Sequence, residues 1–232
     1  MLKGFSGVLG FLLFVVSLGS ATTVTMQLTG FAGPDGGPNT SGGVYTYPYY
    51  FSITSGTTTS TNVALVCDSY DNEVWKDETW TANEVSLTDV IAGTADGLYG
   101  PASLYEDAAW LFSKMGTHPN SANAAKYNWA IWGLFSSAAK TQSAYTTSGA
   151  STIVLPTDFT GFDFSGYSIY VPVKPPDGTL NGKPVNTLPQ EYLGYSPTHT
   201  GGGPPPKTPE PGSLLLVGVG ATALLGKFRA NR

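Results

Sequence analysis

The chain has 232 residues, of which 16 are acidic and 11 are basic, so its formal net charge at neutral pH is −5. An acidic surface repels phosphate backbones, and we therefore expect no nucleic-acid partner. The single cysteine, Cys67, excludes an intramolecular disulfide. Two alternatives stay open for it: a small buried hydrophobic residue or a reactive thiol.

Residues 1–21 have the pattern of a secretory signal peptide. Lys3 gives a positive start, an apolar stretch runs from Phe5 to Leu18, and the small residues Gly19 to Ala21 offer a cleavage site. These are the three parts of an export signal. We therefore predict an N-terminal signal helix that takes no part in the fold of the exported protein.

Alternating and β-branched segments then predict antiparallel strands at 22–29, 44–54, 62–67 and 78–86. Pro48 places a bulge or an edge position in the second strand. Alternation puts Tyr45, Tyr47 and Tyr49 on one face of that strand. Two interpretations stay open for these tyrosines: cross-strand packing, or an exposed row that stacks on the sugars of a polysaccharide.

Two helices are predicted after these strands. Pro101 suits a first helical turn, Ser103 and Glu106 fit a capping box, and Gly116 fits a C-terminal cap. Apolar residues at helical spacing predict a second helix over 122–139, in which flanking tryptophans indicate burial on more than one side.

Further strands are expected at 151–155 and 167–173, followed by a Pro/Gly-rich linker over 174–208. The predicted fold class is α+β. We expect a β-rich antiparallel sheet or sandwich with a two-helix insertion, built from residues 22–173 as one exported domain.

Three segments of residues 44–135 resemble the thioester domain of bacterial surface adhesins. They are Leu65-Val66-Cys67-Asp68, the Ala108-Ala109-Trp110-Leu111 helix, and Asn128-Trp129-Ala130-Ile131-Trp132. The resemblance implies that a cysteine at a strand end meets a glutamine on a helix, where the thiol displaces ammonia from the carboxamide.

Position 128 departs from that pattern, because Asn128 stands where the family has glutamine. Asparagine is one methylene shorter, and reacting atoms must come within ~3–3.5 Å of each other. Cys67 and Asn128 are thus a degenerate thioester pair, and we expect the scaffold without the bond. A covalent adhesin that reacts through Cys67 remains the alternative.

No other catalytic or metal-binding set is predicted. The sequence has no Gly-x-Ser-x-Gly motif, and His118 and His199, its two histidines, are expected to be solvated. The acidic segment 68–78 lacks the spacing of a calcium loop, and we expect a solvated hairpin there. The prediction is a non-enzymatic protein with no metal and no cofactor.

The C-terminal residues 209–232 have three parts: Pro209-Glu210-Pro211, an apolar run from Gly212 to Gly226, and a basic end with Lys227, Arg229 and Arg232. Their order and position resemble the PEP-CTERM sorting signal. The resemblance implies an exosortase as the partner that recognises Pro209-Glu210-Pro211.

The apolar run is shorter than the ~20 residues that span a bilayer core comfortably, and the basic residues favour the cytoplasmic side. We therefore expect a transmembrane helix that holds the chain in the inner membrane only transiently, through residues 212–228. The final location would be the cell surface or the extracellular matrix. Exosortase systems are associated with exopolysaccharide, which makes exopolysaccharide an expected partner.

Overall fold

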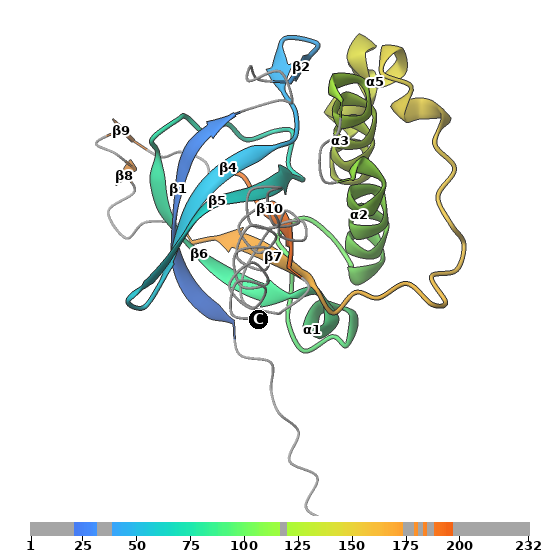
Figure 1. The fold of residues 1–232 in the computed structure, drawn as a ribbon. Coiled ribbons are helices and arrows are strands. Elements are labelled where there is room, and N and C mark those ends of the chain that lie inside the picture. Colours follow the sequence, from blue (N-terminus) through green and yellow to red (C-terminus); the bar gives the residue numbers. More distant parts are fainter. Residues whose placement is uncertain are drawn as a thin grey trace, which may run out of the picture.

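The computed structural model describes residues 21–31, 39–116, 120–173, 179–180, 183–184 and 188–196. Its main body is a closed barrel of six antiparallel strands in the order β1-β4-β5-β10-β7-β6 (Figure 1). These strands are β1 (Thr22–Phe31), β4 (Tyr49–Ser55), β5 (Thr58–Cys67), β6 (Thr79–Ser86), β7 (Tyr167–Pro172) and β10 (Tyr192–Tyr195). Two small pairs join β2 (Thr40–Ser41) to β3 (Val44–Tyr45) and β8 (Thr179–Leu180) to β9 (Lys183–Pro184).

The helices follow β6 and precede β7 in the chain. They are α1 (Leu87–Ile91), α2 (Ala102–Met115), α3 (Ser121–Phe135), α4 (Ser137–Thr141), α5 (Ser143–Thr147) and the short 3-10 helix η1 (Ala150–Thr152). In Figure 1, α2 and α3 lie side by side on one side of the barrel. The α+β prediction is confirmed, whereas the sheet closes into a barrel instead of forming a sandwich.

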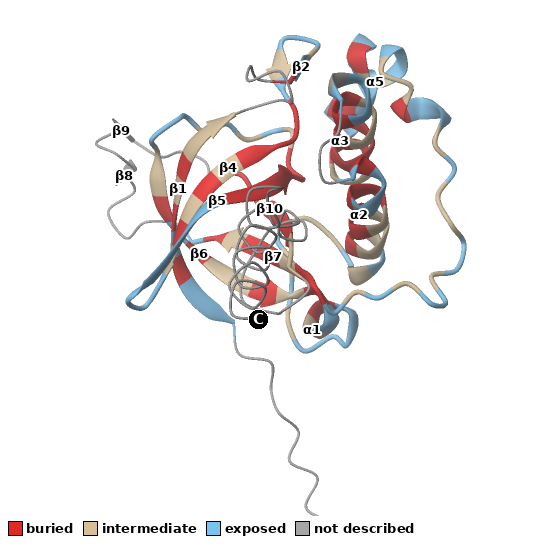
Figure 2. Ribbon diagram, in the orientation of Figure 1, coloured by how far each residue is buried: buried red, intermediate tan, exposed pale blue. Residues whose placement is uncertain are grey.

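The pattern of burial explains why the strands close. Val24, Met26 and Leu28 alternate inward on β1, with more exposed residues between them. On β5 the first five residues are exposed, and the five from Val63 to Cys67 are all buried. A strand buried on both faces must be covered twice, here by the barrel interior and by the helices (Figure 2).

Helix α3 is buried on more than one side, as its tryptophans predict. Trp129 and Trp132 are 1% and 2% exposed. The helix contacts α2, α4, α5, η1, β2 and β5. Its N-terminus is capped by Asn120, whose side chain accepts a hydrogen bond from the Asn123 amide at 2.8 Å.

Several predicted boundaries differ from the structure. The strand expected over 44–54 is interrupted between β3 and β4, where the Tyr47–Pro48 peptide is cis. The predicted capping box at α2 is not made, because Pro101 is the N-cap residue and provides no side-chain hydrogen bond. The expected second helix ends at Phe135, and Ser136 caps α4 instead.

One strand prediction was wrong, and so was part of the linker prediction. Residues 151–155 form the end of η1 and an extended segment instead of a strand. The expected linker over 174–208 contains β10, which pairs with β5 and β7 and completes the barrel. The folded domain therefore extends beyond residue 173, to Tyr195.

The predicted signal helix before Ala21 and the sorting-signal residues Pro209, Glu210, Pro211, Lys227, Arg229 and Arg232 lie outside the described residues, as do His118 and His199. Within the described ranges, none of the helices has the length and apolar character needed to cross a membrane.

Candidate functional site

Cys67 and Asn128 lie next to each other in the structure. Cys67 is the last residue of β5, and Asn128 projects from α3. The Asn128 amide nitrogen donates to the Cys67 carbonyl oxygen at 3.0 Å, and the Asn128 side-chain oxygen accepts from the Tyr47 backbone amide at 2.8 Å. The carboxamide thus ties α3 to the end of β5 and to the segment that precedes β4.

The Cys67 thiol is held in its neutral form. Its side chain is 0% exposed, and the thiol donates to the Ser69 carbonyl at 3.0 Å. Burial is the largest cause that raises the pKa of the Cys67 thiol well above its ordinary value. Because the thiolate is the nucleophilic form, this environment keeps Cys67 unreactive.

A pair of buried carboxyl groups lies beside the cysteine. Asp68, expected in a solvated loop, is 0% exposed, and so is Glu191 on the segment leading into β10. Each group affects the protonation of the other. Burial and the neighbouring Glu191 charge raise the pKa of Asp68, and burial also raises the pKa of Glu191. The expectation of a fully solvated acidic hairpin was therefore wrong for its first residue.

The hydrogen-bond donors around the pair distinguish the two carboxyl groups. Glu191 accepts from the Tyr105 hydroxyl at 2.7 Å and from the Leu98 amide at 2.9 Å. No N–H or O–H group among the described residues donates to the Asp68 carboxyl oxygens. The protonated form is therefore favoured more strongly at Asp68, while Glu191 accepts the surrounding hydrogen bonds.

Gly97 has no side chain, and this lets its backbone lie directly against the Tyr105 ring. A Cβ atom at Gly97 would lie 2.2 Å from the Tyr105 ring, so a side chain there would displace Tyr105. The Tyr105 hydroxyl also accepts from the Tyr99 amide at 2.9 Å. The loop between α1 and α2 is therefore fastened to β10 through Tyr105 and Glu191.

The three tyrosines predicted to share one face do not form a common exposed surface. Tyr45 is 44% exposed, but Tyr47 and Tyr49 are 1% and 4% exposed. The interruption at Pro48 breaks the alternation, so Tyr47 packs against Phe112 of α2 and Tyr49 against Tyr192 of β10. A sugar-stacking row of Tyr45, Tyr47 and Tyr49 is excluded by this burial.

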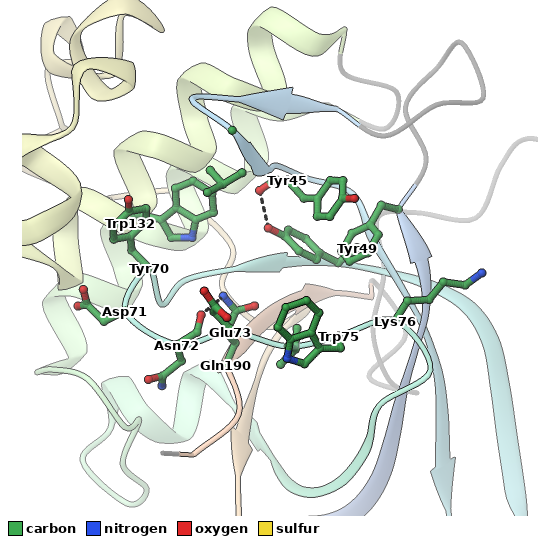
Figure 3. Close-up of a pocket in the computed structure, with 14 residues that line it drawn as sticks. Tyr45, Tyr49, Tyr70, Asp71, Asn72, Glu73, Trp75, Lys76, Trp132 and Gln190 are labelled. Carbon is green, nitrogen blue, oxygen red and sulfur yellow. Dashed lines mark hydrogen bonds between the residues drawn. The ribbon is translucent and has the colours of Figure 1, made fainter. Parts of the chain in front are cut away.

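An open groove of about 660 Å³ lies outside this buried centre, between the β3–β4 segment and the loop before β6 (Figure 3). Its walls include Tyr45, Tyr49, Tyr70, Trp75 and Trp132. Acidic and amide side chains also line it, together with one lysine. They are Asp71, Asn72, Glu73, Lys76 and Gln190.

In the part of the chain that the structure describes, no group of three or more histidine, cysteine, aspartate or glutamate side chains could hold a metal ion. The acidic residues of the 68–78 segment do not converge, because Asp68 points into the core while Asp71, Glu73 and Asp77 are exposed.

Sequence reasoning missed Glu191, Gln190 and Trp75 as members of these two sites. Glu191 and Gln190 fall in the expected linker, where a strand of only four residues without alternation gives no local signal. Trp75 belongs to no predicted strand or helix, so no periodic pattern points to it. A large aromatic residue in a polar loop is nevertheless a signal for binding.

Comparisons with protein-family models, with curated proteins and with solved structures return no match to this chain.

Proposed function

We propose that this chain is a non-enzymatic exported protein of the cell surface or extracellular matrix, delivered by an exosortase that recognises Pro209-Glu210-Pro211. The observation that carries the proposal is the ordered C-terminal signal: the Pro-Glu-Pro motif, an apolar run too short for a comfortable span, and a basic end. The secretory pattern of residues 1–21 supports export independently.

The end of the barrel leaves a segment of chain before the sorting motif. The barrel ends at Tyr195, which leaves residues 196–208 between the folded domain and the sorting motif. A chain of that length can extend over roughly 40 Å. This reach lets an exosortase act on the motif at the membrane without a clash with the domain.

A non-enzymatic role is supported by the state of the polar groups that could perform chemistry. Cys67, Asp68, Asn128 and Glu191 are each 0% exposed, and the side chains of Cys67, Asn128 and Glu191 hydrogen bond within the protein. A substrate would have to unfold the region between β5, β10 and α3 to reach them. We therefore assign this cluster to the stability of the domain.

Replacement of Pro209, Glu210 and Pro211 by alanine tests the sorting proposal. The variant should accumulate in the inner-membrane fraction at its unprocessed mass, as should the unchanged chain in a host that lacks the exosortase. Lys207→Ala, which changes a residue beside the motif, is the matched control and should be processed normally. Normal processing of the triple variant would refute the proposal.

Covalent adhesion through Cys67 is the second candidate, favoured by the contact between the Asn128 amide and the Cys67 carbonyl. Two features oppose it. Both ends of the Asn128 carboxamide bond to backbone groups, and the thiol donates to Ser69. Methylamine treatment distinguishes the candidates, because a thioester would acquire a covalent methylamine adduct, whereas a non-covalent protein keeps its mass.

A further inference from the structure

Two exposed aromatic side chains gather in the groove described above. Tyr45 and Trp75 are 44% and 60% exposed, and among the residues whose burial the structure describes no other aromatic side chain is exposed. Both line the same groove, although 30 positions separate them in the chain. Single exposed apolar residues are common on proteins, but a cluster in a concave site indicates a binding surface.

The Trp75 side chain projects from a turn that is fixed to the barrel. The Trp75 amide donates to the Glu78 carboxylate at 2.7 Å, and the Glu78 amide donates back to the Trp75 carbonyl at 3.0 Å. Asp77, which has a positive φ of 68°, donates its amide to the Leu28 carbonyl of β1 at 2.7 Å. The backbone that carries the indole is therefore fixed before a ligand binds, which lowers the entropic cost of binding.

Tyr45 is held in a similar way. Its ring stacks on Phe31 with centroids 4.1 Å apart and an angle of 15° between the planes. Its carbonyl oxygen accepts from the Tyr49 hydroxyl at 2.6 Å. In Figure 3 the Trp75 indole lies below the Tyr45 and Tyr49 side chains, and the loop with Asp71, Asn72 and Glu73 lies beside them.

The polar residues of the loop are fixed from behind by Gln190. The Gln190 amide nitrogen donates to the Ser69 and Asn72 carbonyls, and its oxygen accepts from the Tyr192 hydroxyl at 2.8 Å. This anchoring to β10 holds the backbone while Asp71 and Glu73 remain exposed in the groove. Carboxylates at these two positions are acceptors for hydroxyl donors of a ligand.

These features together select the chemistry of the ligand. Phosphate or uronate groups are disfavoured, because Asp71 and Glu73 outnumber Lys76 in the groove. A purely apolar chain is disfavoured because it would cover these charged groups without pairing them. A sugar ring presents an apolar C–H face for an aromatic platform and hydroxyl groups for carboxylates.

We propose that the groove binds an uncharged saccharide chain, with Trp75 and Tyr45 as stacking platforms and Asp71 and Glu73 as hydroxyl acceptors. This inference rests on the proposed function in one respect: an exported protein would meet this ligand as a polysaccharide outside the cell. The groove itself is defined by the contacts given above.

Affinity electrophoresis of the full chain in native gels tests the inference. The gels contain one of four neutral polymers (galactomannan, xyloglucan, mixed-linkage β-glucan or dextran) or the acidic polymer polygalacturonate. We expect at least one neutral polymer to retard the protein. Trp75→Ala should raise the dissociation constant obtained from the mobility in that polymer at least tenfold. Tyr45→Ala should weaken the retardation less, and Trp75→Phe should retain part of it, because a phenyl ring preserves a stacking face.

Ile91→Ala is the matched control, since Ile91 is 37% exposed and does not line the groove. It should migrate like the unchanged protein in every gel. Three results would overturn the inference: no retardation by any of the four neutral polymers, equal retardation of Trp75→Ala and the unchanged protein, or stronger retardation by polygalacturonate than by the neutral polymers. Processing of the tail does not enter this assay, so its failure and a failure of sorting are distinguishable.

Discussion

At the residue scale, Asn128 has the position of a reaction partner and the contacts of a structural residue. Its carboxamide lies beside Cys67, but it satisfies the Tyr47 amide and the Cys67 carbonyl, both deep in the core. Buried backbone groups left without partners each cost about 1–3 kcal/mol. This gives Asn128 a structural role that does not need the thioester.

Asn128→Ala should therefore destabilise the protein by about 3 kcal/mol, because two buried backbone groups lose their partner at once. Asn123→Ala is the control, since Asn123 lies on the same helix and is exposed. It should change the free energy of unfolding by less than about 0.5 kcal/mol. Chemical denaturation measures both values, and a similar stability of the two variants would show that the Asn128 contacts contribute little.

At the element scale, the Asp68–Glu191 pair joins the end of β5, the start of β10 and the loop between α1 and α2. The pKa of Asp68 is raised in the folded protein, so the folded state binds more protons than the unfolded state once the pH exceeds the ordinary value of 3.8. Stability then falls as the pH rises from that value towards the folded pKa.

Within that window, one bound proton corresponds to a loss of about 1.4 kcal/mol per pH unit. Asp68→Asn should remove this component, because an asparagine side chain has no titrating proton. We expect the variant to gain stability relative to the unchanged protein as the pH rises above the ordinary value of 3.8, at up to about that rate until the folded pKa is reached. Urea denaturation at several pH values measures it, and parallel pH profiles for the two proteins would contradict the proton assignment.

The elements also show what the sequence could and could not predict. β1, β6 and β7 were predicted close to their observed bounds, because their local pattern and their burial agree. The interruption before β4 and the closure by β10 depend on contacts between distant segments. A strand of four residues after a Pro/Gly-rich segment has no local signature, although Tyr192 packs against Tyr49, Phe51 and Trp80 in the barrel.

Some residues of the two sites could be predicted from the sequence, and others could not. The resemblance to thioester domains brought Cys67 and Asn128 to attention, and the structure places them in contact. The burial of Asp68 and its partner Glu191 could not be predicted, because 123 positions separate these residues and the pair forms only when β10 enters the barrel. Trp75 could not be assigned to a binding site from the sequence, because only the fold places it in the same groove as Tyr45.

At the scale of the whole molecule, β10 decides where the domain ends. A chain that stops at residue 173 lacks the strand between β5 and β7, and it also lacks Glu191 and the buried Tyr192 and Leu193. We expect this truncated chain to be unfolded by circular dichroism and heteronuclear NMR. A chain that stops at Ser196 retains the complete barrel and should fold, and a cooperative unfolding transition of the shorter chain would contradict the assignment of β10 to the core.

The described part of the molecule is a closed barrel with helices on one side, and we propose that residues 1–21 direct its export and residues 209–232 its sorting. The groove with Trp75 and Tyr45 faces outward, and the polar groups around Cys67 are enclosed. Binding is thus assigned to the surface of the domain, and delivery to residues outside it.

The intact mass of the mature protein, isolated from its host without prior alkylation, tests the central claim most directly. The account predicts a mass that begins near Thr22, that lacks the apolar run after Pro211, and that shows no loss of ammonia. A mass equal to the full 24.3 kDa chain would contradict export and sorting. A mass lower than the trimmed sequence by one ammonia would contradict the structural role of Cys67 and Asn128.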